Sequence, residues 1–167
     1  MANGNVEEIM TKRLSVYAIL FSIAVAAASV QAYVPVDNDG KWLVSLNGQW
    51  RFTLNGPKDA FHRAGFDDSK WASIKVPANW EVEGFEEPQY RKLNDGTGLY
   101  RRQFSVPFAW KSRRTIVRFE GVLYGFQFWV NGKKAGSFNS AFNRSEFDIS
   151  DLVRFDGSNM LDRKSVV

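Results

Sequence analysis

The sequence predicts an antiparallel β-sandwich of the jelly-roll type. From residue 33 onward, hydrophobic and polar residues alternate in short runs, which is typical of half-buried strands. Turn-forming Gly, Pro, Asn and Asp residues interrupt these runs at short intervals, and no stretch has the spacing of a helix of any length. Seven or eight such strands together with one long loop indicate a sandwich.

The composition fits one globular domain and excludes several kinds of site. The chain has 167 residues, of which 44% are hydrophobic, 15% aromatic and 24% charged. It has no cysteine and a single histidine, His62, which excludes disulfides, thiol nucleophiles and zinc fingers. The remaining catalytic chemistry is that of carboxylate, Ser, Lys or Tyr side chains, and we expect neither a metal nor a cofactor.

The formal net charge of +4 does not predict a nucleic-acid partner. Nucleic-acid-binding proteins concentrate Lys and Arg on one stripe or helix face. Here the basic residues are scattered along the chain, as expected for solvated strand and turn positions.

Residues 1–32 have the pattern of a signal peptide and are not expected to belong to the fold. Lys12 and Arg13 precede an apolar run over 14–30, and a cleavage site follows with Ala32 as its last residue. We therefore expect export to the periplasm or the extracellular space, with no stable membrane association after cleavage. A retained anchor is the alternative, because the run is at the lower edge of what spans a bilayer. Met10 is an alternative start that would give a more usual signal.

The first part of the mature chain contains two predicted strands joined by a loop. Hydrophobic side chains alternate with polar ones over 50–54, so one face of this strand, including Trp50, is expected in the core. The Asn-Gly-Pro sequence at 55–57 ends the strand. A loop over 58–71 follows, in which Asp and Ser side chains can hydrogen-bond to the backbone. The second strand covers 74–76.

The clearest prediction is a hairpin near the middle of the chain. Strands are expected at 100–106 and 115–119, and a third over 124–130 leads into Asn-Gly at 131–132. Asn-Gly between two alternating runs is the signature of a type I′ turn, whose two central residues both need positive φ. The partner strand of the hairpin then covers 133–138.

The last part of the chain contains shorter elements. A strand is expected at 147–149, and one helical turn at 151–154. Gly-Ser-Asn at 157–159 is a turn that should lead into a final strand.

One segment, 81–97, is too long for a hairpin turn and has no periodic pattern. Long loops on rigid β scaffolds commonly carry function. Trp80, Phe85 and Tyr90 bracket this segment and are better candidates for exposure than the aromatic residues inside the strands. An exposed ring can stack on the apolar face of a pyranose, whereas an aromatic residue inside an alternating strand belongs to the core.

No pair of carboxylates in the chain predicts a glycosidase active site. Glycoside hydrolysis needs two carboxyl groups that face each other across the scissile bond. The adjacent pairs at 67–68 and 86–87 would point to opposite faces of an extended chain. Glu81 and Glu83 lack an apolar setting that would raise the pKa of one of them. We therefore expect no catalytic residue in this chain.

A series of short sequence blocks resembles the N-terminal sugar-binding domain of glycoside hydrolase family 2, in particular that of its β-galactosidases. The resemblance spans 43–161, in order and at the spacing of the family. The blocks are SLNGQWRF (45–52), VPANW (76–80), GF (84–85), PQY (88–90), YRRQFSVP (100–107), FEGV (119–122), WVNG (129–132), FDIS (147–150) and GSNML (157–161).

The resemblance implies that this chain is the non-catalytic part of a longer parent enzyme. In that family the domain is a galactose-binding-domain-like jelly roll, followed by an immunoglobulin-like domain and a TIM barrel that holds both catalytic glutamates. It implies that 33–161 is a non-catalytic sugar-binding and scaffold domain of an exported glycosidase acting on terminal β-galactosides or related glycosides. Its partners would be carbohydrate and the remaining domains of the parent chain, and the piece alone would be inactive. A free-standing, secreted lectin-like module is the alternative.

The resemblance also implies candidate substrate-binding residues. In the β-galactosidases the long loop reaches the active site and offers an Asn shortly after a motif like the Pro-Gln-Tyr at 88–90. In this chain the position two after Tyr90 is Lys92, and the nearest amide is Asn94. The candidate substrate-binding residues are therefore Asn94, Tyr90 and Trp80.

The last six residues, 162–167, depart from the family pattern, which continues with a Val-rich strand. They are the translation of GAT CGG AAG AGC GTC GTG, a string found in common sequencing adapters, whose next triplet is TAG. We expect this tail to be adapter read-through and the last strand to be cut short after Leu161. Such a strand would leave a partner edge unpaired. A natural polar tail is the alternative.

Overall fold

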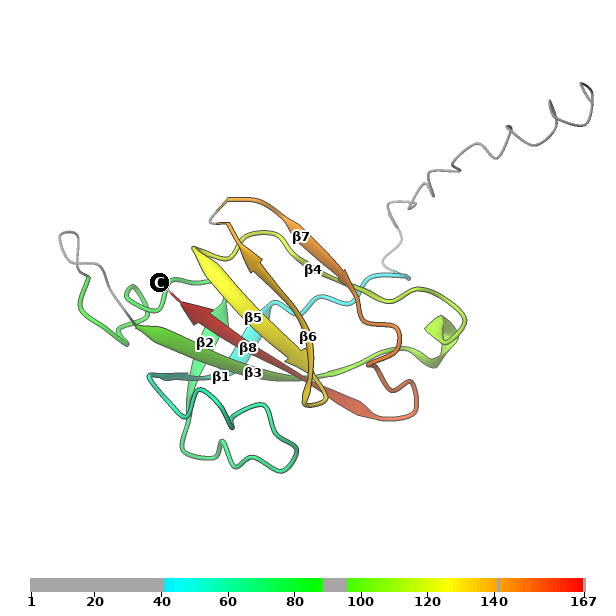
Figure 1. The fold of residues 1–167 in the computed structure, drawn as a ribbon, viewed down its shortest axis with the longest axis horizontal. Helices are drawn as coiled ribbons and strands as arrows, with labels where there is room; N and C mark the ends of the chain where they lie inside the picture. The colour runs from blue at the N-terminus through cyan, green and yellow to red at the C-terminus, as the bar shows by residue number, and fades with distance from the viewer. Residues whose placement is uncertain (1–40, 89–95, 141, 167) are drawn as a thin grey trace, which may run out of the picture. The chain divides into compact units, whose positions relative to one another are not determined.

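The computed structural model describes residues 41–88, 96–140 and 142–166. They form eight strands and one short 3-10 helix, η1 (Phe108–Trp110) (Figure 1). The strands are β1 (Gly48–Leu54), β2 (Ala72–Val76), β3 (Thr97–Ser105), β4 (Ile116–Phe119), β5 (Gly125–Val130), β6 (Lys133–Asn139), β7 (Ser145–Asp148) and β8 (Ser158–Val166). Within these ranges no helix is long and apolar enough to cross a membrane. The predicted signal peptide, 1–32, lies outside the described residues.

The strands form two antiparallel sheets, which confirms the predicted all-β sandwich. The larger sheet has six strands in the order β2-β1-β3-β8-β5-β6, and the smaller sheet pairs β4 with β7. Neighbouring strands are antiparallel throughout both sheets. Apolar side chains of β4 and β7 pack against one face of the larger sheet, so the main core lies between the two layers.

Alternation along the strands fills this core with aromatic rings. Trp50 and Phe52 of β1 and Phe128 of β5 are buried, which confirms the expectation for Trp50. Phe119 and Phe147 from the smaller sheet meet Phe128 in edge-to-face contacts, with ring centroids 5.2 and 4.9 Å apart. Such contacts stabilise the packing beyond the burial of area alone.

The predicted hairpin is present, and its start differs from the expectation. Asn131 (φ 52°) and Gly132 (φ 82°) both have positive φ, which confirms the turn signature. The side-chain amide of Asn131 donates to the carbonyl oxygen of Leu152 and to Oδ1 of Asn159, each at 2.8 Å. Tyr124 was expected in the alternating strand, and this is wrong. Its φ of 62° takes it out of the strand, and its side chain is exposed.

The segment after β7 is close to the expected one. β7 ends at Asp148, so Ile149 lies just outside the strand, although its side chain is buried. The backbone N–H of Val153 donates to the carbonyl oxygen of Ile149 at 3.2 Å. The single helical turn therefore begins two residues earlier than the predicted 151–154.

The last strand is longer than the sequence led us to expect. β8 continues past Leu161 to Val166 and pairs with all nine residues of β3 on one side and with β5 on the other. Residues 162–166 thus occupy the middle of the larger sheet, and no partner edge is left open beside them. The adapter origin proposed for 162–167 stays a prediction.

A second cluster of aromatic residues covers the outer face of the larger sheet. Phe61, Phe66 and Trp71 come from the loop between β1 and β2 and pack on Leu99 and Trp129. This face would be solvated in a sandwich with only two layers, so the loop acts as a partial third layer.

Polar contacts anchor that loop. Nε of Arg101 donates to Oδ1 of the fully buried Asp162 at 2.6 Å, and Nη1 of Arg101 donates to the carbonyl oxygen of Phe66 at 3.0 Å. Nη2 of Arg51 donates to the carbonyl oxygens of Asp68 and Ser69 at 2.6 and 2.8 Å. Arginine side chains of the sheet thus donate hydrogen bonds to carbonyl groups of the loop, which would otherwise be buried without a partner.

Candidate functional site

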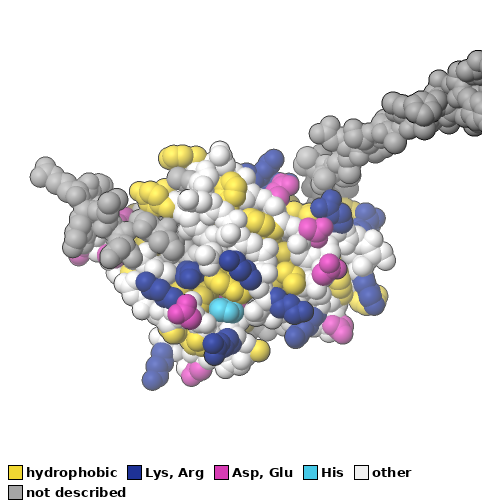
Figure 2. Space-filling model, in the orientation of Figure 1, with side chains coloured by type: hydrophobic (Ala, Val, Ile, Leu, Met, Phe, Trp, Pro, Cys, Tyr) yellow, Lys and Arg dark blue, Asp and Glu magenta, His cyan; other side chains and the backbone are white. Residues whose placement is uncertain are grey.

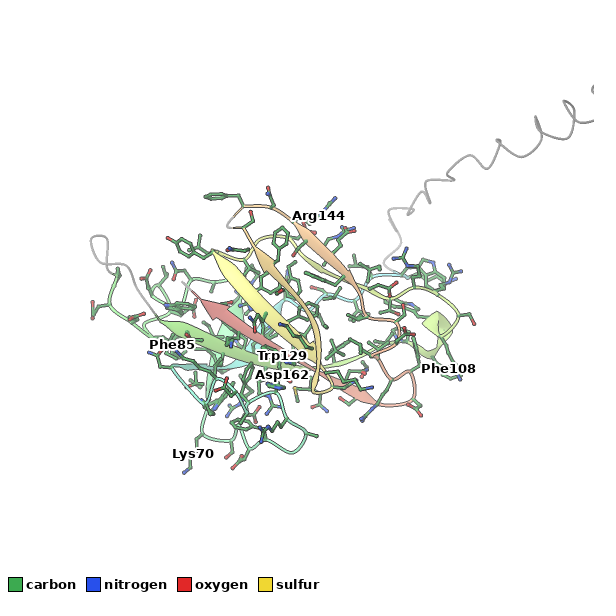
Figure 3. The ribbon with its side chains drawn as sticks, in the orientation of Figure 1. Lys70, Phe85, Phe108, Trp129, Arg144 and Asp162 are labelled. Atoms are coloured by element: carbon green, nitrogen blue, oxygen red, sulfur yellow. The ribbon has the colours of Figure 1, made fainter. Side chains whose placement is uncertain are left out.

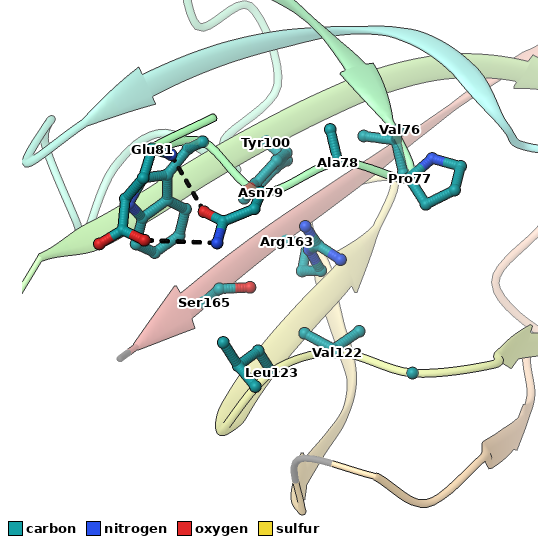
Figure 4. A pocket seen from close by; sticks show the side chains of 12 residues that line it. Val76, Pro77, Ala78, Asn79, Glu81, Tyr100, Val122, Leu123, Arg163 and Ser165 are labelled. Carbon is teal, nitrogen blue, oxygen red and sulfur yellow. Dashed lines mark hydrogen bonds between the residues drawn. The ribbon is translucent and has the colours of Figure 1, made fainter. Parts of the chain in front are cut away.

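A pocket of about 170 Å³ lies near the end of the sandwich where β8 ends and β3 and β5 begin (Figure 4). We call it the Trp80 pocket. Its walls come from three places: the segment 76–81 after β2, the segment 121–123 before β5, and the core-facing side of β3 and β8. From the two central strands it takes Tyr100, Arg163 and Ser165.

The segment after β2 forms a tight turn that holds two polar side chains at the pocket. The backbone N–H of Glu81 donates to Oδ1 of Asn79 at 3.0 Å, and Nδ2 of Asn79 donates to Oε2 of Glu81 at 3.3 Å. The backbone N–H of Glu83 donates to the carbonyl oxygen of Asn79, which closes the turn. Figure 4 shows the amide of Asn79 and the carboxylate of Glu81 side by side. An Asx turn of this kind uses the local hydrogen bonding for which Asn is favoured in turns.

Aromatic rings form one wall of the pocket and are themselves fixed by the core. Trp80 is 7% exposed and stacks on Phe52, with ring centroids 6.1 Å apart. Tyr100 lies against Phe52 at 4.7 Å and against Trp50 at 6.5 Å. Gly98 makes room for this arrangement, because a Cβ at that position would lie 2.7 Å from Cζ3 of Trp80.

Arg163 and Ser165 place buried polar atoms at the base of the pocket. The guanidinium of Arg163 stacks 4.0 Å from the ring centroid of Tyr100. Nε of Arg163 and Oγ of Ser165 are buried and make no hydrogen bond within the described part of the chain. Burial lowers the pKa of Arg163 and raises the pKa of Tyr100. Unsatisfied buried donors are costly, so a ligand that supplied acceptors to them would bind favourably.

This combination suits a small ligand rich in hydroxyl groups. Aromatic edges provide an apolar surface, and the amide, carboxylate, guanidinium and hydroxyl groups provide both donors and acceptors. Pockets that bind small ligands commonly combine an apolar lining with a few convergent polar groups.

The three predicted substrate-binding residues have different outcomes. Trp80 lines the pocket; although it was a candidate for exposure, its ring is buried, because the turn after β2 folds it onto Phe52. Phe85, another candidate for exposure, is partly buried and packs edge-on against Phe52 at 4.7 Å. Tyr90 and Asn94 lie outside the described residues.

Sequence reasoning missed Asn79, Tyr100, Arg163 and Ser165 as pocket residues. Asn79 stands in the VPANW block, so its position in a turn after a strand was the available signal. Tyr100 was treated only as part of an alternating strand, and nothing local distinguishes it from a core tyrosine. Arg163 and Ser165 were assigned to a tail outside the fold, which removed them from consideration.

The carboxylates near the pocket do not form a facing pair. Glu81 is tied to Asn79, and Glu83 lies in the turn with an exposed side chain rather than on an extended strand. No group of three or more His, Asp and Glu residues that could hold a metal ion occurs among residues 41–88, 96–140 and 142–166.

Comparisons with known proteins agree on one family. Residues 43–163 match the family described as "Glycosyl hydrolases family 2, sugar binding domain". A β-galactosidase of Psychromonas ingrahamii is 37% identical over 122 residues, which cover 63% of this chain and 12% of that enzyme. A β-galactosidase of Vibrio cholerae is 33% identical over 134 residues, covering 70% of this chain and 13% of the enzyme.

Solved structures of a second type of enzyme have the same fold as this chain. A crystal structure of Bacteroides uniformis β-glucuronidase superposes with a TM-score of 0.64 and 32% identity, over 74% of this chain and 14% of that one. A β-glucuronidase of an uncultured Clostridium species superposes with a TM-score of 0.65 and 25% identity, over 79% and 23% of the two chains. This chain therefore spans less than a quarter of the length of these relatives.

Proposed function

The chain belongs to the sugar-binding domain family of the family 2 glycosyl hydrolases, and from this premise we propose that it is the N-terminal, non-catalytic part of an exported β-galactosidase-like enzyme. The matched region, 43–163, corresponds to about an eighth of the β-galactosidases that resemble it, so most of such an enzyme would lie outside this chain. The parent would hydrolyse O-glycosidic bonds, and this domain would bind sugar and support the rest of the enzyme.

The observation that carries this proposal is the Trp80 pocket. It is built largely from sequence blocks through which the chain resembles the family, VPANW at 76–80 and FEGV at 119–122. We propose that the apolar face of a terminal β-galactoside or related sugar contacts the rings of Trp80 and Tyr100. Its hydroxyl groups would bond to Asn79 and to the unsatisfied groups of Arg163 and Ser165. Tyr90 and Asn94 stay proposed contacts of the same sugar.

A lectin-like module is the second candidate function, and one observation favours it. The described residues that line the Trp80 pocket lie between positions 76 and 165, so this chain by itself supplies the aromatic and polar groups named above. A free-standing domain could therefore bind a galactoside without ever hydrolysing it.

Isothermal titration of the chain with methyl β-galactoside and methyl β-glucuronide tests the pocket. Binding with a Kd of about a millimolar or tighter supports a lectin-like site. Asn79→Ala should then weaken binding about fivefold, because it removes one neutral hydrogen bond. Asn47→Ala, at an exposed turn position outside the pocket, is the matched control and should leave binding unchanged. A chain that binds neither sugar is consistent only with the scaffold role.

Sequencing the source nucleic acid across the codon for Leu161 tests the proposed parent. If the reading frame continues into a Val-rich strand and then a barrel with two facing glutamates, the chain is a piece of a hydrolase. If codons 162–167 and the stop are present in the gene, the hydrolase proposal fails and the lectin-like module replaces it.

Export is tested by expressing the whole chain and sequencing the N-terminus of the secreted product. We propose that the mature chain begins at Tyr33, with Ala32 as the last residue removed. A product that stays in the membrane with residues 1–32 attached would show that the segment is an anchor.

A further inference from the structure

We propose that the chain has a second carbohydrate-binding surface, which takes a polysaccharide bearing anionic groups, either carboxylate or sulfate. This η1 surface goes beyond the proposed function, because it shares no residue with the Trp80 pocket. It lies around η1, at the opposite end of the sandwich. Figure 3 shows Phe108 at this end and Phe85, next to the Trp80 pocket, at the other. The surface comprises Lys41, Trp42, Phe108, Trp110, Lys111 and Arg113.

The shape of this end suits an extended chain better than a single sugar. A broad, open concavity of about 760 Å³ lies there, against about 170 Å³ for the Trp80 pocket. Its lining comes from residues 111–114 after η1 and from residues 148 and 150–152 after β7. Because the concavity is open to solvent, a ligand larger than a single sugar can reach it.

Aromatic rings are held in place beside the concavity. Trp42 and Trp110 lie with their ring centroids 6.3 Å apart, and Nε1 of Trp110 donates to the carbonyl oxygen of Lys41 at 3.3 Å. Phe108 is 66% exposed and Leu43 is 63% exposed. Rings fixed by such contacts lose little side-chain entropy when a sugar stacks on them.

Three cations surround these rings with their charges available. The guanidinium of Arg113 lies 3.9 Å from the centroid of Trp42, and Nζ of Lys41 lies 5.0 Å from the same ring. Nζ of Lys111 lies 5.4 Å from the centroid of Phe108. Among the residues that the structure describes, no carboxylate forms an ion pair with any of these three groups.

The stacking of Arg113 prepares it for an anionic ligand. A guanidinium that lies flat on an indole ring keeps its N–H donors, which point outward in its own plane. Those donors match the two oxygens of a carboxylate or two oxygens of a sulfate. The ring thus positions the cation without using the hydrogen bonds that the ligand would take.

The rest of the concavity favours a sugar polymer over another polyanion. Asp148, Ser150 and Asp151 line it together with the basic residues, so it is not a continuous basic stripe of the kind that nucleic acids need. Figure 2 shows basic, acidic and hydrophobic side chains interspersed at this end. Carboxylate and hydroxyl side chains can hydrogen-bond to the hydroxyl groups of a sugar. A polyanion without hydroxyl groups cannot form these bonds.

The test is affinity electrophoresis of the whole chain in gels that contain one polymer at a time. The probes are polygalacturonate for carboxylate, dextran sulfate for sulfate, unmodified dextran as the neutral sugar polymer, and polyglutamate as the polyanion without sugar. We expect retardation by at least one of the two anionic polysaccharides, about tenfold stronger than by dextran or polyglutamate. The anionic polysaccharide that binds more tightly identifies the charged group.

Matched variants distinguish binding at the η1 surface from non-specific attraction by the net charge of the chain. Arg113→Gln and Phe108→Ser should each weaken binding about threefold to tenfold, since each removes one exposed contact. Lys70→Gln and Phe142→Ser remove an exposed cation and an 89% exposed ring elsewhere and should leave binding unchanged. Circular dichroism of each variant checks that it is folded.

Several results would overturn the proposal. These are equal losses in the matched pairs, binding as tight to polyglutamate as to the polysaccharides, binding as tight to unmodified dextran, and no retardation by any polymer. The Trp80 pocket does not enter this experiment. Failure here therefore leaves the Asn79→Ala titration with galactosides as an independent test of the proposed function.

Discussion

The packing of Trp80 at its pocket depends on a residue without a side chain, Gly98. A Cβ on Gly98 would lie 2.7 Å from Cζ3 of Trp80 and 3.0 Å from Cε2 of Tyr100, closer than real contacts allow. We predict that Gly98→Ala lowers the free energy of unfolding by about 1–3 kcal/mol, as other overpacking substitutions do. It should also displace the ring of Trp80 and so alter the pocket. Urea denaturation measures the first effect.

Gly121→Ala is the control for this prediction. Gly121 also lines the pocket, but no atom lies within 4 Å of a Cβ built there, and its backbone is not left-handed. The substitution should change stability little. If the two variants lose stability equally, the close approach of Trp80 to the strand is not what matters at position 98.

The raised pKa of Asp162 predicts how the stability of the protein depends on pH. Burial raises the pKa of Asp162 to about 6, and the nearby charge of Arg101 offsets only part of that rise. In the unfolded chain an Asp ionises near pH 4, so between about pH 4 and 6 the folded state holds the proton more tightly. The free energy of unfolding should therefore fall as the pH rises through this window and level off above it.

Urea denaturation at several pH values measures this dependence. Asp148 has its pKa lowered to about 2 by hydrogen bonds from Ser150 and Arg114, so its contribution is lost only as the pH falls below about 4. Asp162→Asn should flatten the dependence above pH 4, because the amide cannot ionise and resembles the protonated carboxyl at every pH. A stability that rises between pH 4 and 6 would contradict the assignment.

At the scale of elements, the packing of β6 on β7 depends on another glycine. A Cβ on Gly136 would lie 2.5 Å from Cδ1 of Phe147 and 2.8 Å from Cε1 of Phe128. Gly136→Ala should therefore push the smaller sheet away from the larger one, at a cost of about 1–3 kcal/mol in thermal or urea unfolding.

Ser137→Ala tests whether the effect belongs to this contact. Ser137 is the next residue of β6, and its side chain is exposed. The substitution Ser137→Ala changes the same strand but not the core, so the free energy of unfolding should stay nearly unchanged. A comparable loss in both variants would mean that β6 itself, rather than its contact with Phe147, limits stability.

At the scale of the whole molecule, the fold depends on its last strand. β8 lies between β3 and β5 in the six-stranded sheet and supplies Asp162 to the buried ion pair with Arg101. We predict that a chain ending at Leu161 does not unfold cooperatively, because β3 loses five of its nine pairs with β8, β5 loses five of its six, and both become open edges there. Circular dichroism during heating, and light scattering for aggregation, would show this.

Lys164→Ala is the control for the shortened chain. It keeps the backbone pairing of β8 and removes only a partly exposed side chain, so the fold should persist. A shortened chain that unfolds as cooperatively as the complete one would show that residues 162–166 are dispensable, as expected for read-through of an adapter.

Local patterns in the sequence were reliable where the structure depends on neighbours. Alternation predicted the strands around Trp50 and Phe128, and Asn-Gly predicted the turn at 131–132, because side-chain direction and positive φ are set within a few residues. Tyr124 was misplaced because the same alternation continues one step beyond the strand, where the backbone turns left-handed.

The candidate site was predicted less well, because its residues meet from distant parts of the chain. Trp80 looked like a residue of an exposed loop, yet its ring stacks on Phe52 from β1. The outer cluster was not predicted either. Its loop is held by Arg101, whose partner Asp162 lies 61 positions along the chain.

The sequence by itself determined the all-β class, the approximate positions of the strands along the chain, the hairpin turn and the family, since these rest on short patterns that each segment carries alone. Only the tertiary structure decided which aromatic rings are buried, where the Trp80 pocket opens and which cations lie against the rings around η1. The physical reason is that burial and pairing depend on what packs against a residue, and in a sheet whose neighbours are far apart in sequence no local pattern contains that information.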